Sequence, residues 1–338
     1  MEKNLMQGNA LTMKEVNRGL VQNALQSLKR ATKKQLAQHT GLSVVTVNSV
    51  LKQLILQKEV FEEHTVPSAG GRPAQLYCYN PNNRYIAVLF GHMLNTYCTL
   101  ELRVYNLFKE CVFAASEETQ EVHIESFVSM LDSAAERYTI AAIGFGLPGA
   151  EENGNIYLND FQAIVGVEFL NYYHVKYQVP VVYENDLNAA VLGYYSTMAQ
   201  PVSNVVGICF PATCPPGAGI VIDGKIYKGS HNFAGEVSNV PVGVDWNTLD
   251  YANLEAVQAA VAKLTAAVCS ILAPQKIILY GTFFTPQVCM AVTTQCVQQL
   301  NHLFVPEIEF SRNFIRHFEI GIAKHTLEQM EPTLVLSR

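Results

Sequence analysis

The sequence lacks the features that direct a chain into or across a membrane. It contains no charged segment followed by an apolar stretch near its first residues, and no uninterrupted apolar run of about 18 residues or more. Its eight cysteines form no Cys-x-x-Cys pair and have none of the spacing of a zinc site. Scattered cysteines of this kind predict reduced, mostly buried thiols. We therefore expect a cytoplasmic protein that spans no membrane and holds no metal.

Charged residues are also scarce, at 15% of the chain, and they are unevenly distributed. Residues 1–80 hold ten Lys and Arg against five Asp and Glu, a balance of +5, whereas the remaining residues have a balance of −11. A chain of 338 residues is long enough for two or three domains. The asymmetry predicts a separate basic unit in the first part of the chain, and nucleic acid is its natural partner.

Helical spacing of apolar residues predicts helices at 17–30 and 44–56 within this basic part. Ser43 can cap the second of these helices. Between them, residues 32–35 read Thr-Lys-Lys-Gln, which has the form of a capping box and opens a short helix that Gly41 can end. Helix, short helix, glycine turn and helix predict a helix-turn-helix.

The last of these helices would enter the major groove of DNA, with basic side chains near phosphates. Three short helices can also form a protein-interaction module, but the local excess of positive charge favours DNA. Two strand-like runs, 59–65 and 75–79, follow and are joined by a glycine-rich tip that carries Arg72. Such a wing can place a guanidinium in a narrow minor groove, although the tip could equally be an ordinary solvent-exposed turn. The candidate DNA contacts are Lys33, Lys34, Ser43, Thr46, Asn48, Lys52 and Arg72.

From residue 84 onward, strands alternate with helices, and apolar spacing predicts, among others, helices at 124–138 and 254–272 and a strand at 276–280. The order of three strands followed by alternating helices and strands occurs twice, which predicts two similar α/β lobes with a cleft between them. The expected domains are a winged helix-turn-helix at 1–80, a first lobe at 81–200, and a second lobe with a C-terminal helix at 201–338.

One stretch of the first lobe, residues 181–190, passes from a β-branched run into an alanine-rich helical start. Asn185 or Asp186 can cap that helix. A carboxylate at such a junction is well placed to take a proton from a bound hydroxyl, because the helix N–H groups and the strand end hold it still. The alternative interpretation is that Asp186 is only a cap.

Five motifs occur along the chain in a fixed order. They are Gly-Gly-Arg-Pro at 70–73, Gly-Phe-Gly-Leu-Pro-Gly at 144–149, Glu-Asn-Asp-Leu-Asn-Ala-Ala at 184–190, Gly-Ala-Gly-Ile-Val-Ile-Asp-Gly-Lys at 217–225 and Ala-Gly-Glu at 234–236. Together they resemble the ROK family (repressors, open reading frames and kinases), in the branch with an amino-terminal winged helix. The resemblance covers nearly the whole chain. It implies a winged helix-turn-helix joined to an α/β two-lobed, actin-like ATPase (ribonuclease H-like) fold that binds sugar between the lobes.

The resemblance also implies where the ligand lies. In the kinases of the family, the aspartate matched by Asp186 is the general base on the sugar hydroxyl. The residues matched by Asn185 and Glu236 bind sugar hydroxyls. The candidate ligand contacts are therefore Asn185, Asp186 and Glu236, with Gly149 and Asn239 as further candidates.

Several family motifs are missing. Residues 89–95 stand where the first phosphate loop carries an aspartate, and they contain none. The second phosphate loop reads Thr-Cys-Pro-Pro-Gly at 213–217, where the two prolines supply no N–H donors to a phosphate. Ser238-Asn239 replaces the Gly-His pair of the family's zinc site, and residues 240–251 contain no cysteine. Because phosphoryl transfer depends on positioning by both loops, we expect no kinase activity, no cofactor and no zinc. Trp246 could stack on a sugar, but a packing role is the more common one.

These observations favour a DNA-binding transcriptional regulator, a repressor, with a catalytically degenerate kinase-like domain that senses a sugar or other metabolite. Its expected partners are a double-stranded DNA operator, a sugar or sugar-phosphate effector, and further copies of itself in a homodimer or homotetramer. Two alternatives remain at this point. One is a ROK-type sugar kinase that carries a DNA-binding domain, and the other is a regulator that is ligand-independent or controlled by a protein.

Overall fold

The computed structural model describes the backbone of residues 2–68, 71–94, 97–211, 214–301 and 306–330, and within these ranges the side chains of residues 13–63, 73–92 and 97 onward. The chain folds into two compact units. The first, unit 1, comprises residues 1–85 together with 105–112. The second, unit 2, comprises residues 86–104 and 113–330.

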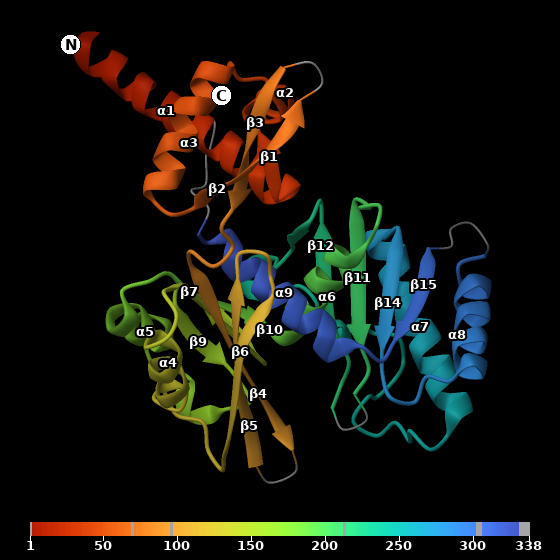
Figure 1. Cartoon of the computed structure of the whole chain (residues 1–338). Helices are drawn as coiled ribbons and strands as arrows, with labels where there is room; N and C mark the ends of the chain where they lie inside the picture. Colours follow the sequence, from red (N-terminus) through yellow and green to blue (C-terminus); the bar gives the residue numbers. More distant parts are fainter. Residues whose placement is uncertain (1, 69–70, 95–96, 212–213, 302–305, 331–338) are drawn as a thin grey trace. The chain divides into compact units, whose positions relative to one another are not determined.

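Unit 1 combines helices with a small antiparallel sheet whose strand order, over the described residues, is β1-β3-β2 (Figure 1). Buried apolar side chains from all three helices and from the sheet form one core, which includes Leu25, Leu36, Leu54 and Tyr77. In chain order the elements are α1 (Glu2–Leu28), β1 (Arg30–Thr32), α2 (Lys33–Thr40), α3 (Val44–Leu56), β2 (Val60–Ser68) and β3 (Gly71–Tyr79).

The predicted boundaries of α2 and α3 rest on local capping, and the structure confirms them, whereas the helix predicted at 17–30 begins earlier, at Glu2, and ends at Leu28. Thr32 and Gln35 form the capping box of α2, with the Thr32 N–H donating to Gln35 Oε1 at 2.8 Å. Gly41 ends α2 in the left-handed conformation, at φ 72°. The Ser43 hydroxyl accepts the Thr46 N–H at 3.1 Å and starts α3. Strand β1 was not predicted, because three residues are too short to show a strand pattern.

Residues 105–112, the tip of the hairpin formed by β5 and β6, belong to unit 1. The buried Asn106 side chain donates to Asn82 Oδ1 at 3.1 Å and accepts the Phe108 N–H at 2.9 Å. The Phe108 ring lies 5.7 Å from that of Tyr79, between ring centroids. The predicted first domain, 1–80, does not include this segment. Within the described residues, the chain therefore passes between the two units three times.

Unit 2 contains two sheets that, within the described residues, have five strands each and the same order of strands. The order is β10-β7-β4-β5-β6 in the first lobe and β15-β14-β11-β12-β13 in the second. The prediction of two similar α/β lobes is thereby confirmed. The first-lobe strands are β4 (Tyr85–Leu94), β5 (Tyr97–Asn106), β6 (Cys111–Thr119), β7 (Ile140–Leu147) and β10 (Val181–Asn185). The second-lobe strands are β11 (Asn204–Cys209), β12 (Gly217–Ile222), β13 (Lys225–Ile226), β14 (Lys276–Tyr280) and β15 (Glu307–Ser311).

The helices of unit 2 follow the prediction with some shorter ends. The helix expected at 124–138 is reduced to α4, and Phe127 at its start has no side-chain cap that would extend it. A small hairpin of β8 (Ala150–Glu152) and β9 (Asn155–Leu158) was not predicted. The helices are α4 (Val128–Ala135), α5 (Phe169–Tyr177), α6 (Asp186–Thr197), α7 (Leu254–Leu272), α8 (Pro286–Gln299) and α9 (Phe314–Glu328).

Helices α6 and α9 cross between the two lobes (Figure 1). Helix α6 follows β10 of the first lobe but packs on β11 and β12 of the second. Helix α9 follows β15 of the second lobe but packs on β7 of the first. At their crossing a Cβ on Gly193 would lie 1.7 Å from the His317 carbonyl oxygen, and one on Gly321 would lie 1.8 Å from that of Ala189. Glycine is therefore required where the two helices exchange lobes.

Among the described helices, α7 has the length and the apolar composition that a membrane span needs. Its buried residues, which include Val257, Val261 and Leu264, belong to the core of the second lobe. The apolar character of α7 is thus accounted for by packing on its own sheet and on α8.

Candidate functional site

A pocket of about 310 Å³ lies within unit 2, between the two lobes. The first lobe contributes the turn after β7 and the junction of β10 with α6. The second lobe contributes the segment before β12 and the chain that follows β13. Polar and acidic side chains line it, among them Glu151, Asp160, Asn185, Asp186, Lys228, Asn232 and Glu236.

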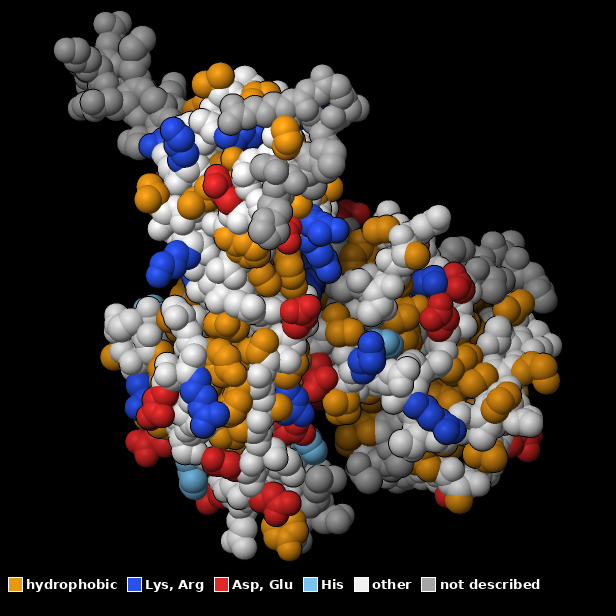
Figure 2. Space-filling model, in the orientation of Figure 1, with side chains coloured by type: hydrophobic (Ala, Val, Ile, Leu, Met, Phe, Trp, Pro, Cys, Tyr) orange, Lys and Arg blue, Asp and Glu red, His pale blue; other side chains and the backbone are white. Residues whose placement is uncertain are grey.

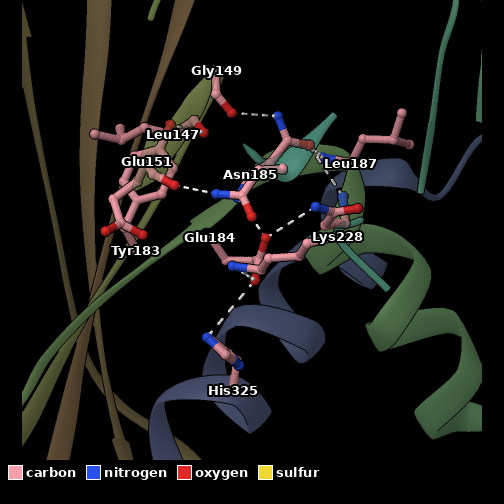
Figure 3. A network of polar contacts seen from close by, with 11 residues as sticks. Leu147, Gly149, Glu151, Tyr183, Glu184, Asn185, Leu187, Lys228 and His325 are labelled. Carbon is pink, nitrogen blue, oxygen red and sulfur yellow. Dashed lines mark hydrogen bonds and ion pairs between the residues drawn. The ribbon is translucent and has the colours of Figure 1, made fainter. Parts of the chain in front are cut away.

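Asn185, rather than Asp186, is the cap of α6. Its Oδ1 accepts the N–H groups of Leu187 at 2.9 Å and Asn188 at 3.2 Å. Its Nδ2 donates to the Gly149 carbonyl oxygen at 3.1 Å (Figure 3). Both ends of the amide are thus engaged within the protein. The choice left open by the sequence is settled in favour of Asn185, and Asp186 occupies the first position of the helix.

Gly149 contributes to the site through its backbone conformation. Its φ is 100°, and a Cβ at this position would lie 2.0 Å from the Leu158 carbonyl oxygen. A residue with a side chain could not hold the same turn, because it would clash with β9 and strain the backbone. The predicted candidate therefore contributes a carbonyl oxygen that positions Asn185.

Asp186 is half-buried and faces the pocket. The pKa of its carboxyl is raised from 3.8 to about 6, mainly by burial; the Leu187 N–H lowers this pKa and the nearby charge of Asp160 raises it. Loss of hydration disfavours the charged form, and this is the largest cause. A carboxylate in this state can accept hydrogen bonds, or a proton, from a hydroxyl in the pocket.

Glu184 lies at the floor of the same region, with 1% of its surface exposed. Its Oε2 lies 2.9 Å from Lys228 Nζ and 3.8 Å from His325 Nε2 (Figure 3). Its Oε1 accepts the Asn188 side-chain amide at 3.1 Å. Burial lowers the pKa of His325, which favours the neutral ring. The carboxylate thus joins the end of β10, the chain after β13 and α9.

Sequence reasoning missed Glu184, Lys228 and His325. A charged residue that ends a β-branched run was a usable signal, since a buried carboxylate needs a partner. The partners themselves were not identifiable, because Lys228 and His325 lie far along the chain.

Of the two remaining predicted ligand residues, Glu236 and Asn239, only the first lines the pocket. Glu236 lines the pocket from the second lobe. Asn239 is not among the lining residues, and its side-chain amide donates to the Glu236 carbonyl oxygen at 3.4 Å. The structure therefore brings together Gly149, Asn185, Asp186 and Glu236.

A second pocket, of about 450 Å³, lies at the carboxyl ends of the parallel strands β11, β14 and β15. Its lining is mainly apolar and includes Phe210, Tyr280, Gly281, Arg312 and Phe314. Trp246 is 5% exposed and packs against Phe210, with ring centroids 5.9 Å apart. The packing interpretation of Trp246 is confirmed. Thr213 and Asn95, which belong to the two segments compared with phosphate loops in the sequence analysis, lie outside the described residues.

The candidate DNA contacts all lie on unit 1, whose surface carries Lys and Arg side chains in the face drawn in Figure 2. Lys34 and Lys52 are exposed, Asn48 is half-buried, and Lys33 Nζ lies 5.4 Å from the centre of the Tyr77 ring. The hydroxyls of Ser43 and Thr46 are 2.9 Å apart and hydrogen-bonded to each other. The side chain of Arg72 lies outside the described residues.

Two sheets of one strand order, joined by crossing helices around a polar pocket, define a two-lobed α/β fold. The fold is shared with a crystal structure of a ROK family transcriptional regulator, a homolog of the E. coli MLC protein (TM-score 0.68, 17% identity, 94% of this chain and 97% of that chain). It is also shared with the ROK hexokinase from Thermus thermophilus (TM-score 0.58, 17% identity, 71% of this chain and 97% of that chain). Residues 86–245 of the chain match the ROK family.

Curated relatives of the chain are similar at the level of sequence. A xylose repressor of Caldicellulosiruptor bescii is 25% identical over 252 residues, which are 70% of this chain and 61% of that protein. The xylose repressor of Bacillus subtilis strain 168 is 23% identical over 239 residues, 68% of this chain and 61% of that protein. The chain thus spans about three fifths of the length of these relatives.

Proposed function

We propose that this protein is a cytoplasmic DNA-binding transcriptional regulator, a repressor, whose two-lobed unit 2 senses a sugar. The geometry at the start of α6 carries this proposal. Because Asn185 caps the helix, the carboxylate of Asp186 is left to face the pocket, with a pKa raised to about 6. Glu236 lies on the opposite lobe of the same pocket. Carboxylates on two sides of a cleft suit a ligand rich in hydroxyl groups. The names of the curated relatives support xylose as the first sugar to test.

The DNA-binding part of the proposal rests on unit 1. The order α1-β1-α2-α3-β2-β3 fits a winged helix-turn-helix, with α3 as the recognition helix and the turn between β2 and β3 as the wing. The balance of +5 over residues 1–80 suits a phosphate backbone. A homodimer or homotetramer would place two such units on a palindromic operator of double-stranded DNA.

Ligand binding reaches unit 1 through the hairpin of β5 and β6. These strands belong to the sheet of the first lobe, and residues 105–112 at their tip belong to the core of unit 1. A sugar that favours one closure of the lobes would shift this sheet, and the strands would carry the shift to the DNA-binding unit. Such coupling requires the sugar to bind the two closures with different affinity.

The test measures direct binding of D-xylose, D-glucose and N-acetylglucosamine, by calorimetry and by the shift in thermal unfolding. A sugar present at 100 times its Kd should raise the free energy of unfolding by about 2.7 kcal/mol. Asp186→Ala should weaken binding by roughly 10-fold to 100-fold, because it removes a hydrogen bond to a charged group. Asp223→Asn is the matched control, since Asp223 is exposed on the turn between β12 and β13 and does not line the pocket.

Two outcomes would contradict the proposal. Absence of binding by every sugar in a wider panel, sugar phosphates included, would favour a regulator controlled by a protein partner or independent of ligand. If the protein turns over a sugar with ATP, and Asp186→Asn abolishes that turnover, the kinase alternative would be established instead.

A further inference from the structure

The solvent-facing side of α3 begins with two apolar residues that the fold of unit 1 does not need. Val44 is 50% exposed and Val45 is 80% exposed. The core is supplied by other residues of the same helix, Val47, Val50, Leu51 and Leu54. Valine is also a weaker helix former than alanine or a polar straight-chain residue, so helix stability does not account for this pair.

The polar groups at the start of α3 are already engaged. The Ser43 hydroxyl accepts the Thr46 N–H and is hydrogen-bonded to the Thr46 hydroxyl at 2.9 Å. These two predicted DNA contacts are therefore committed to the cap of the helix. The most exposed side chain in the first turn of α3 is the apolar Val45.

Exposed basic side chains occur on the same helix and on the helix before it. Lys34 is exposed at the start of α2, and Lys52 is exposed two turns along α3 from Val45. On a helix, residues at spacings of three, four and seven share one face, so Val45, Ser49 and Lys52 present a single stripe to solvent. An apolar start flanked by positive charge suits a partner that carries apolar groups between rows of phosphates.

The major groove of DNA offers one apolar group on its base edges, the C5-methyl of thymine. Resting on the proposed function, we propose that Val44 and Val45 read thymine methyl groups and so select thymine in each operator half-site. The side chains have the right chemistry, since a valine isopropyl group packs against a methyl and offers nothing to hydrogen-bonding bases. The first turn of a recognition helix is also the part that contacts base edges.

The experiment removes apolar groups from either side of the interface in turn. Double-stranded sites are first selected by the full-length protein from a random DNA library, so no operator need be known. Each thymine is then replaced by uracil, which lacks the C5-methyl but keeps the O4 acceptor. We expect one or two thymines per half-site at which uracil weakens binding about fourfold, the value of one buried methyl.

The matching protein variants are Val44→Ala and Val45→Ala. At each sensitive position, the uracil effect should disappear in one of the two variants, because the partner of the methyl is gone. Val45→Thr should keep part of the effect, since threonine retains one methyl. Val175→Ala is the matched control, because Val175 is a 59% exposed valine on α5 of unit 2.

Equal affinity for thymine and uracil at every position, with DNA binding intact, would overturn the inference while leaving the proposed function standing. A uracil effect that persists in both alanine variants would overturn it as well. If the wild-type protein selects no DNA at all, the proposed function fails together with the inference, and that result is distinct from binding without methyl dependence.

Discussion

At the end of β10, the first lobe presents Glu184, Asn185 and Asp186, and a polar pocket follows. At the end of β15, the matching strand of the second lobe, Ser311 and Arg312 line a second pocket, whose lining, which also includes Phe210 and Gly281, is mainly apolar. The two sheets have the same strand order, so the same place in each lobe carries opposite chemistry. The fold provides the two positions, and the side chains at the strand ends decide what each can bind. Carboxylate and amide side chains line the first position, whereas mainly apolar side chains line the second.

The largest effect is expected where the two lobes exchange helices. Gly193→Ala or Gly321→Ala would place a Cβ within 2 Å of a backbone carbonyl oxygen on the facing helix. Backbone atoms cannot move aside as a side chain can, so α6 and α9 would be forced apart. We expect a loss of about 3 kcal/mol or more in the free energy of unfolding, measured by urea denaturation.

Gly154→Ala is the control for this change. Gly154 has a positive φ of 87° but no neighbour within 4 Å of the added Cβ, so only backbone strain remains, at about 1 kcal/mol. Equal losses at Gly154 and Gly193 would contradict the close crossing of the two helices.

A smaller effect is expected from the carboxylate of the polar pocket. Burial raises the pKa of Asp186 to about 6 in the folded protein, above the ordinary value of 3.8. The folded state therefore binds this proton more tightly than the unfolded state. The stabilisation that comes from binding this proton is complete below about pH 4 and is lost as the pH rises through about 6. Asp186→Asn, which cannot ionise, should be more stable than wild type by roughly 1–3 kcal/mol near pH 7 and nearly equal to it near pH 4.

Thermal or urea unfolding at the two pH values measures this difference. Asp223→Asn, at an exposed turn, should show no comparable pH dependence. A variant at Asp186 that is less stable than wild type at neutral pH would show that the carboxylate contributes more as a structural hydrogen-bond acceptor than it costs in lost hydration.

The smallest effect, close to zero, is the change in unfolding temperature that we expect when nucleotides are added to test the second lobe. Pro215 and Pro216, next to β12, have no backbone N–H groups to donate to a phosphate. ATP or ADP with Mg²⁺ at millimolar concentration should therefore leave the unfolding temperature unchanged, under conditions where the effector sugar raises it. A clear shift with ATP would show that the second lobe retains a phosphate site and would weaken the contrast between the lobes.

Parts of this structure were predictable because they depend on neighbours in the sequence. The capping box at Thr32, the cap at Ser43 and the glycine turn at Gly41 are local hydrogen-bond or backbone choices, and the sequence around them suffices. The bounds of α7 and β14 followed from apolar spacing alone. The short β1 and the β8–β9 hairpin could not be predicted, since three or four residues carry too little pattern.

The candidate site shows the same division. Its first-lobe residues, Asn185 and Asp186, were identified from a strand that runs into a helix, but the sequence left open which of them caps α6. The position of the Gly149 carbonyl decided this, because it gives the Asn185 amide a second partner.

By itself, then, the sequence determined the caps, the periodic helices and strands, the charge asymmetry and the doubled order of elements, all of which are set by residues close together in the chain. Only the tertiary structure decided that the Asp186 carboxylate faces the pocket and which residues lie beside the buried Glu184 carboxylate. Lys228 and His325 approach Glu184 from distant segments because the fold buries that carboxylate, and a buried charge is stable only beside its partners.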